Sequence, residues 1–367
     1  MQSKISDMAT TQAGLSIDEY LRKRLMPVEG AIPQLSGIEM YGNSIPAGKV
    51  GGDLFEYINF QQRYNIDGRI ASARNLSQKY LEPLPEGAKP QNGVDAHVRW
   101  LESRPGYTPA DAAQYRKAKS SEQLRIAEEL EDLYTTAGVL LVDAQGHDLI
   151  AAKIASTVHD TFHTAMLSEL DSYGKPTPAL FERINLRLAQ SVTARNALSG
   201  SAEGNPREIA TMMYGEIHPD GLFRFVSFGH LPPLIFSVEY GRFMEIRRCC
   251  TAQFPALGLE VPEDHPDRSK YVSIHLRNSQ MDSSDLAEIT LMGKGDILIL
   301  YTDGVYDGTD ALEREKIERI IEEHKQDLPK VICNAILDHA VRNDDYLRRI
   351  GEADRIDDKT VFVITSK

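Results

Sequence analysis

The order of apolar and polar positions along the chain predicts strands that cluster in sequence and helices that come in pairs. Runs of apolar, branched and aromatic residues favour strands over 38–41, 54–60, 137–142, 211–218, 222–227, 234–238, 296–301 and 360–365. Helical periodicity appears over 149–170, 179–194, 312–325 and 328–342. Because strands and helices do not alternate regularly, we predict an α+β layered fold, with two antiparallel sheets between outer helices.

A long stretch, 61–134, interrupts this pattern between two of the predicted strands. Closely spaced prolines indicate a loop near its middle, and Thr108 followed by Pro109 is typical of a helix start. A helical spacing of apolar residues continues from there to Tyr134. We interpret 61–134 as a helical insertion in a domain that spans 36–367. Two roles are open for it: a lid or partner surface over the active site, or a peripheral decoration.

The first 35 residues are expected to form a polar tail and a linker helix. Ser16 is a candidate N-cap, and Pro27 stands where the helix would end. The chain shows no internal repeat and no low-complexity tract.

Composition narrows the function classes. The 367 residues carry 54 acidic and 41 basic side chains, for a net charge of -13, which argues against nucleic-acid binding. The three cysteines, two of them adjacent, lack the spacing of a disulfide framework or a zinc site. With no signal peptide and no apolar run of membrane-spanning length, a cytoplasmic location without a membrane partner is the default expectation.

Four acidic segments are the strongest candidate for chemistry. Asp53 follows two glycines, Asp143 and Asp303 each follow an apolar strand, and Asp357 and Asp358 stand before the last strand. Taken singly, each segment is explained by a turn, a helix cap or a surface ion pair. Taken together, four converging carboxylates would repel one another unless cations held them, and oxygen ligands suit Mg2+ or Mn2+. Two such ions bridged by one aspartate would form a hydrolytic site.

The same segments carry a family resemblance. The chain contains, in order, PAGKVGGDLFEY at 46–57, DAQGH at 143–147, FGHLPPL at 228–234, YTDGV at 301–305 and DDKT at 357–360. These segments resemble the motifs of the bacterial SpoIIE/RsbU-type serine/threonine phosphatases, a branch of the metal-dependent PPM (type 2C-like) phosphatases. The resemblance covers roughly residues 20–367 apart from the insertion.

The resemblance implies roles for individual residues. Asp143 would bridge two Mn2+ or Mg2+ ions, and the carbonyl of Ala144 would bind one of them. Asp53 would hold the second ion, and Asp303 and Asp357 would hold the first. The assignment of Asp357 over its neighbour as the direct ligand rests on resemblance alone. A water bridged between the ions would attack phosphorus in line, without a covalent enzyme intermediate.

Three departures from the family pattern stand out. Asp148 replaces a glycine and adds a negative charge near the site, while Phe228 replaces an alanine. The usual Phe-Val-Thr strand is replaced by residues 209–213. Asp148 and the altered strand give some support to an alternative function, a non-catalytic binding module on the same fold.

The histidines and Lys49 have weaker signals. His147 is a candidate catalytic residue, as a proton donor to the leaving alcohol or a group that orients the ligands. His230 is better explained by hydrogen bonds that fix a loop, and Lys49 by a solvated turn or a contact to substrate phosphate. His159 and His163 have metal-compatible helical spacing, but without a third ligand nearby we interpret them as surface residues.

The function implied by the resemblance is a metal-dependent phosphoserine/phosphothreonine phosphatase in bacterial signalling. Its substrate would be a phosphorylated protein, for which an anti-sigma-factor antagonist is one expected class. The N-terminal helix is a candidate element for a homodimer. A further alternative is a phosphatase of a small phosphorylated metabolite, which a deep site roofed by the insertion would favour.

Overall fold

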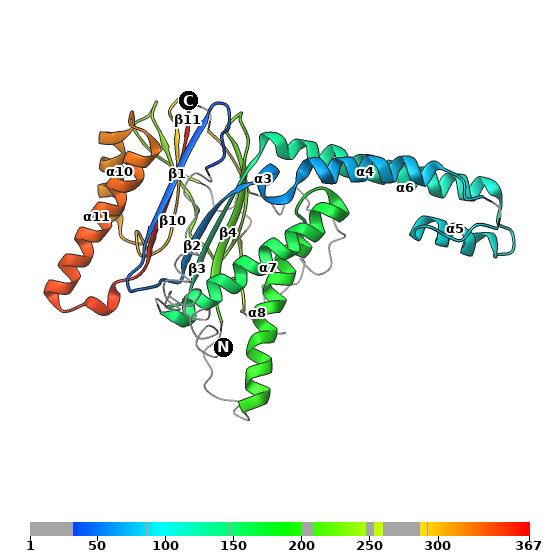
Figure 1. The fold of residues 1–367 in the computed structure, drawn as a ribbon. Coiled ribbons are helices and arrows are strands. Elements are labelled where there is room, and N and C mark those ends of the chain that lie inside the picture. Colours follow the sequence, from blue (N-terminus) through cyan, green and yellow to red (C-terminus); the bar gives the residue numbers. More distant parts are fainter. Residues whose placement is uncertain are drawn as a thin grey trace, which may run out of the picture.

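Two β-sheets pack face to face, and helices cover the outer face of each (Figure 1). The structure is a computed structural model. It describes residues 32–85, 87–146, 148–199, 208–246, 253–259, 287–291 and 293–367. The expected linker helix and dimer element therefore lie outside the described residues, as does His147.

The first sheet contains both the first and the last described strands. Its order is β1 (Ile38–Ile45), β11 (Lys359–Ser366), β10 (Ile297–Tyr301), β6 (Leu234–Ser237) and β7 (Arg242–Met244). All of its neighbouring strands are antiparallel. β11 is buried along nearly its whole length because it lies between β1 and β10 and beneath a helix.

The second sheet carries the other half of the core. Its order is β2 (Asp53–Asn59), β3 (Ala137–Ala144), β4 (Ala210–Ile217), β5 (Leu222–Phe228) and β8 (Gln253–Phe254), and β9 (Ala287–Thr290) also pairs with β5. Its pairs are antiparallel except the two-residue contact of β5 with β8. The sequence did not predict β7, β8 and β9, which have two to four residues each.

Alternation along the strands divides the core into layers. In β2, Phe55 and Tyr57 face the first sheet and pack on Phe362 of β11, with the ring centroids of Tyr57 and Phe362 5.0 Å apart. Leu54 and Ile58 point to the opposite face and pack with the outer helices. Both faces of the sheets are thus buried, which explains why the central strands read as nearly continuous apolar runs.

Paired helices cover the outside, as the sequence predicted. α7 (Leu149–Tyr173) and α8 (Pro178–Ser199) lie on the second sheet. α10 (Ala311–His324) and α11 (Pro329–Ile350) lie on the first. α11 continues past the predicted end at 342, to a left-handed Gly351 that ends it. Within the described residues, no helix is both long and apolar enough to cross a membrane.

The predicted insertion is helical and forms an arm. It consists of α3 (Phe60–Tyr64), α4 (Ile66–Leu81), α5 (Gly93–Glu102), α6 (Pro109–Asp132) and the short 3-10 helix η1 (Leu133–Thr135). α4 and α6 pack along each other and extend away from the sheets, with α5 near the far end (Figure 1). The expected start of α6 is present as a capping box between Thr108 and Asp111.

The direction of the arm follows from the strand register. β2 and β3 pair with Asp53 opposite Asp143 at one end and Asn59 opposite Ala137 at the other. At about 3.3 Å per residue, the two ends of this strand pair lie about 20 Å apart. The arm joins Asn59 to Ala137, so it leaves the sheet at the end that is remote from the aspartates. The arm therefore does not form a lid over the aspartates, which leaves a partner surface or a peripheral element.

Within the arm, a buried ion pair holds α5 against α6. Arg116 of α6 lies 2.8 Å from Asp95 of α5, and both side chains are less than a tenth exposed. Arg116→Ala would leave a buried carboxylate unpaired, a change that typically destabilises by about 3–5 kcal/mol. We expect hydrogen exchange to show faster exchange of the α5 amides in this variant.

The control for this prediction is Arg125→Ala in the same helix, which removes an exposed pair with Glu129 at 3.6 Å. That variant should change exchange little, because exposed pairs contribute at most about 1 kcal/mol. Equal protection of α5 in both variants would contradict the role assigned to Arg116.

Candidate active site

The aspartates singled out in the sequence meet at one end of the sandwich. Asp143 lies near the end of β3, and Asp303 follows β10. Asp53 opens β2 and Asp357 precedes β11, so these two stand at strand starts. Strand starts and strand ends meet at the same edge because the neighbouring strands are antiparallel.

Asp53 connects the two sheets. The hydroxyl oxygens of Thr302 and Thr360 both lie 2.7 Å from its Oδ2. These threonines belong to the first sheet and its loops, whereas Asp53 belongs to the second. The contacts fix one carboxylate oxygen of a side chain that is only 8% exposed.

The two neighbouring aspartates before β11 have different surroundings. Asp358 accepts hydrogen bonds from the backbone N–H groups of Ala47 and Gly52, each at 2.6 Å, so both of its oxygens are used. It thereby holds the loop that leads to Asp53. Asp357 accepts a bond from the N–H of Asp358 through Oδ1 at 2.8 Å. It lines a cavity of about 320 Å³ together with Asp303.

Proximity and burial raise the pKa values of these carboxyls. Burial, reinforced by the charges of Asp303, Asp357 and Asp358, raises the pKa of Asp143 to about 7. Burial and the charge of Asp143 raise the pKa of Asp53 well above its usual value. Burial and the charge of Asp357 raise the pKa of Asp303 in the same way. The site therefore favours protons or cations that neutralise it.

The donor set fits hard divalent cations. It offers several carboxylates and, next to them, the backbone carbonyl of Ala144. A Cβ on Gly52 would lie 2.5 Å from that carbonyl oxygen, so only glycine lets the two strands approach this closely. Oxygen donors without nitrogen or sulfur are the ligands that Mg2+ and Mn2+ prefer.

His230 has the structural role that the sequence favoured. Its Nδ1 lies 2.7 Å from the hydroxyl of Thr211, and its Nε2 lies 3.1 Å from the carbonyl oxygen of Tyr301. Burial lowers the pKa of His230 to about 4, so the ring is neutral near pH 7. His230 thus joins β4 to β10. Thr211, which lies in the strand that departs from the family pattern, serves as its hydrogen-bond partner.

We expect His230→Ala to reduce stability and not to remove a titrating catalytic group. The variant would leave the buried Tyr301 carbonyl without this partner, which typically costs about 1–3 kcal/mol. A lower midpoint in urea should accompany a pH–rate profile with inflections at the wild-type positions. Displacement of an inflection would contradict the structural role.

Two other departures also have structural explanations. The carboxylate of Asp148 accepts hydrogen bonds from the N–H groups of Ile150 and Ala151, at 2.8 and 3.0 Å, and so caps α7. Phe228 packs between Phe181 and Phe254, with ring centroids 5.1 and 5.2 Å away. Lys49 is exposed.

The interpretation of His159 and His163 as surface residues is wrong. Their side chains are only 13% and 12% exposed, and both lie against Glu56 of β2. Their helical spacing was visible in the sequence, but Glu56 is more than a hundred positions away along the chain. Only the packing of α7 on β2 brings the three together.

Comparison with known proteins identifies the family. The model of the family described as Stage II sporulation protein E matches residues 135–274 and 284–367. These segments contain the motifs of Asp143, Asp303 and Asp357, whereas Asp53 precedes them. A search of curated proteins gave no match.

Several solved structures are similar to this chain at low sequence identity. The phosphatase domain of SpoIIE from Bacillus subtilis, solved with a fragment of its regulatory domain, is 12% identical, with a TM-score of 0.47 over 91% of this chain and 64% of that one. The RsbU and RsbW domains of a Mycobacterium tuberculosis protein are 14% identical, with a TM-score of 0.45 over 93% and 64%. The SiaA-PP2C domain of Pseudomonas aeruginosa is 12% identical, with a TM-score of 0.45 over 100% and 98%.

The chain spans 64% of the length of the first two of these structures. The family model, by contrast, matches more than half of this chain, in two segments that run from β3 to the C-terminal strand. The chain therefore belongs to the family described as Stage II sporulation protein E (SpoIIE).

Proposed function

We propose that this protein hydrolyses phosphoserine or phosphothreonine in proteins, using Mg2+ or Mn2+, as part of a bacterial signalling system. The observation that carries the proposal is the convergence of Asp143 with other buried carboxylates, where burial, reinforced by the neighbouring charges, raises the pKa of Asp143 to about 7. Folding these charges together is unfavourable without a cation, and a site built against such repulsion is typical of function.

Two ions would be held by the oxygens of Asp53, Asp143, Asp303 and Asp357 and by the carbonyl of Ala144. When bound, such ions supply an acidified water and neutralise charge on a phosphoryl group. Asp143 is the candidate bridging ligand because it lies close to all the other proposed ligands. Together with burial, the charges of Asp303 and Asp357 raise the pKa of Asp143, and the charge of Asp143 raises the pKa of Asp53. Asp357 is preferred over Asp358 because both oxygens of Asp358 already accept backbone hydrogen bonds.

The remaining residues of the site act by positioning. Thr302 and Thr360 hold Oδ2 of Asp53 and leave its other oxygen for a ligand. Asp358 fixes the loop before Asp53, and Asp148 fixes the start of α7 just after Asp143. His147 is retained as a proposed proton donor to the leaving alcohol.

A protein substrate is favoured over a small metabolite. The arm leaves the sheet at the end opposite to the aspartates and extends away from the sheets, so it does not cover them (Figure 1). A phosphorylated loop on a folded partner, such as an anti-sigma-factor antagonist, could therefore approach the site. The proposed dimer through the N-terminal helix is a separate prediction that the size of the full-length protein in solution would test.

The proposal is tested by phosphate release from p-nitrophenyl phosphate and from phosphoserine and phosphothreonine peptides. We expect turnover with Mg2+ or Mn2+ and none in EDTA. Mn2+ binding without turnover of any of these substrates would support the non-catalytic binding module instead. Turnover that persists in EDTA would contradict the metal-dependent mechanism.

A further inference from the structure

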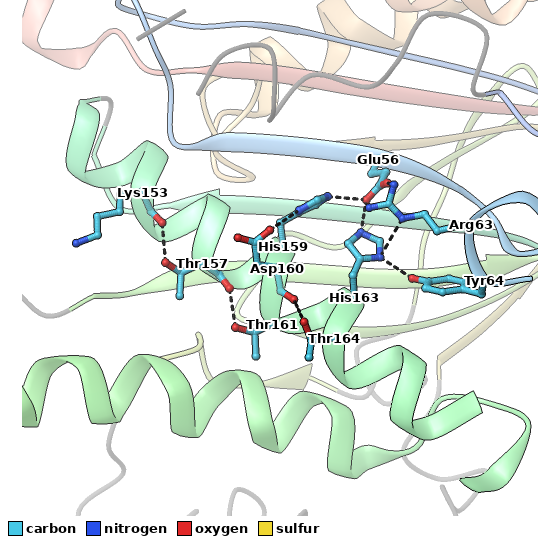
Figure 2. Close-up of polar contacts among 10 residues, drawn as sticks. All are labelled: Glu56, Arg63, Tyr64, Lys153, Thr157, His159, Asp160, Thr161, His163 and Thr164. Atoms are coloured by element: carbon cyan, nitrogen blue, oxygen red, sulfur yellow. Dashed lines mark hydrogen bonds and ion pairs between the residues drawn. The ribbon is translucent and has the colours of Figure 1, made fainter. Parts of the chain in front are cut away.

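A second cluster of metal-compatible side chains lies on the other face of β2. Figure 2 shows Glu56 of β2 beside His159 and His163 of α7. His159 Nε2 lies 3.0 Å and His163 Nε2 lies 2.6 Å from the same carboxylate oxygen, Oε2 of Glu56. In the part of the chain that the structure describes, this is the one group of three such residues whose ligand atoms all lie within 4.8 Å of one another.

The cluster is separate from the aspartate site. Side chains alternate along a strand, so Asp53, Phe55 and Tyr57 point to one face of β2 and Glu56 points to the other. That other face packs on α7, where residues four apart lie on the same side, one helical turn from each other. The two imidazoles therefore face Glu56 together because of the helix spacing and not because of a loop.

We propose that Glu56, His159 and His163 form a binding site for one divalent transition-metal ion, with Zn2+ as the best match. The ligand atoms would be Oε2 of Glu56 and Nε2 of each histidine, with a fourth position for water or another ligand. Two imidazoles and one carboxylate are a donor set that suits Zn2+ and Fe2+, unlike the all-oxygen set of the aspartates.

Glu56 and His163 have protonation states that suit a metal ion. Although burial opposes it, hydrogen bonds from His159 and His163 hold the pKa of Glu56 at about 2, so the carboxylate is ionised. Burial lowers the pKa of His163, which favours the neutral imidazole near pH 7. Binding of zinc at Nε2 would shift each ring proton from Nε2 to Nδ1.

Partners for the other ring nitrogens are also present. When a metal binds Nε2, the ring proton resides on Nδ1 and needs an acceptor. His163 Nδ1 lies 2.5 Å from the hydroxyl oxygen of Tyr64, and His159 Nδ1 lies 3.5 Å from a carboxylate oxygen of Asp160. Such outer partners orient metal-binding histidines and typically contribute about 10–100-fold to affinity.

Arg63 opposes metal binding in two ways. Its guanidinium lies 2.9 Å from Oε1 of Glu56 and adds a positive charge beside the site. Its Nε donates to His163 Nδ1 at 3.3 Å, which favours the ring tautomer that carries its proton on Nε2. Its side chain is 40% exposed, and its ion pair uses the oxygen of Glu56 that the proposed site does not need. Arg63 can therefore turn outward when a metal binds.

A metal here would join two elements that also carry the aspartate motifs. β2 begins with Asp53, and α7 begins just after the loop of Asp143. A bond between Glu56 and the two histidines would fix α7 on β2 at the base of the arm. The proposal does not depend on the phosphatase activity, because the two sites share no ligand.

Zinc titration with a competing chromophoric chelator tests the site directly. Purified full-length protein, freed of metal and kept in excess Mg2+, should bind one equivalent of Zn2+ that His159→Gln and His163→Gln variants do not. We expect each loss to exceed the approximately 100-fold upper range seen for outer partners. Tyr64→Phe should weaken Zn2+ binding by about 10-fold, and Arg63→Ala should strengthen it.

The matched control is His339→Gln, since His339 Nε2 contacts Glu313 in a similar half-buried pair that lacks a second histidine. This variant should bind Zn2+ like the wild type. Co2+ added to the wild-type protein provides a readout that needs no variant, because its visible spectrum reports imidazole ligands. Equal Zn2+ affinity of folded wild type and His163→Gln, or no Co2+ spectrum in the wild type, would overturn the proposal.

Discussion

Replacing Asp143 with asparagine is expected to abolish phosphate release while making the metal-free protein more stable. The variant removes the candidate bridging ligand, whose contribution of several kcal/mol corresponds to a loss of about 10³-fold in turnover. It also removes one charge from a group that includes Asp303, Asp357 and Asp358. The same substitution should therefore lower activity and raise the stability of the metal-free protein. This is expected where active-site residues lower the free energy of unfolding.

The pH dependence of stability gives the sign of this effect. The pKa of Asp143 is about 7 in the folded state, above the value of about 4 in an unfolded chain. Its contribution to stability is thus complete below about pH 4 and is lost as the pH rises through about 7. The melting temperature of the metal-free wild type should fall over this range, and Asp143→Asn should lessen the fall. Added Mg2+ should restore the wild type at about pH 7.5 but not the variant.

Asp148→Asn is the control for this experiment. This substitution would remove a carboxylate charge close in sequence to Asp143, yet asparagine also caps helices well. Turnover should stay near that of the wild type, because Asp148 serves the N–H groups of α7. Equal losses in Asp143→Asn and Asp148→Asn would show that charge near the site matters more than a specific ligand.

Much of the fold could be predicted because its strands are buried on both sides. The strand before Asp143 and the strand before Asp303 read as apolar runs, since each lies inside a layered core. The short strands β7, β8 and β9 have two to four residues each and lack the apolar run that marks the four-residue β6. The direction of the arm was not deduced, although antiparallel pairing of Asp53 with Asp143 places any connection at the remote end.

The aspartates were recognisable in the sequence because each stands at the boundary of a strand. Their partners were not, because these depend on contacts between distant segments. Thr302 and Thr360 reach Asp53 across 249 and 307 positions. Asp148 looked like an added charge beside the site, whereas its actual role depends on where the backbone of α7 begins. Glu56 joins the two histidines only through the packing of β2 on α7.

Gly304→Ala should disable the enzyme without removing any ligand. A Cβ at this position would lie 2.1 Å from the carbonyl oxygen of Asp358. This oxygen belongs to the backbone of Asp358. The neighbouring backbone is fixed by a hydrogen bond of 3.1 Å, which the N–H of Thr302 donates to the carbonyl oxygen of Thr360. Neither segment can relieve the overlap by a side-chain rotation. The loop of Asp303 and the loop of Asp357 must therefore move apart, which would separate two of the proposed ligands.

A displacement of this kind by about 1 Å is enough to reduce turnover by about 100-fold. We expect that loss in phosphate release, together with weaker Mn2+ binding and a lower melting temperature. Gly93→Ala is the matched control, because no atom lies within 4 Å of its added Cβ; it should keep full activity. Wild-type turnover in Gly304→Ala would contradict the close approach of the two loops. A selective loss would show that the spacing of Asp303 and Asp357, and not only their presence, determines metal binding and hydrolysis.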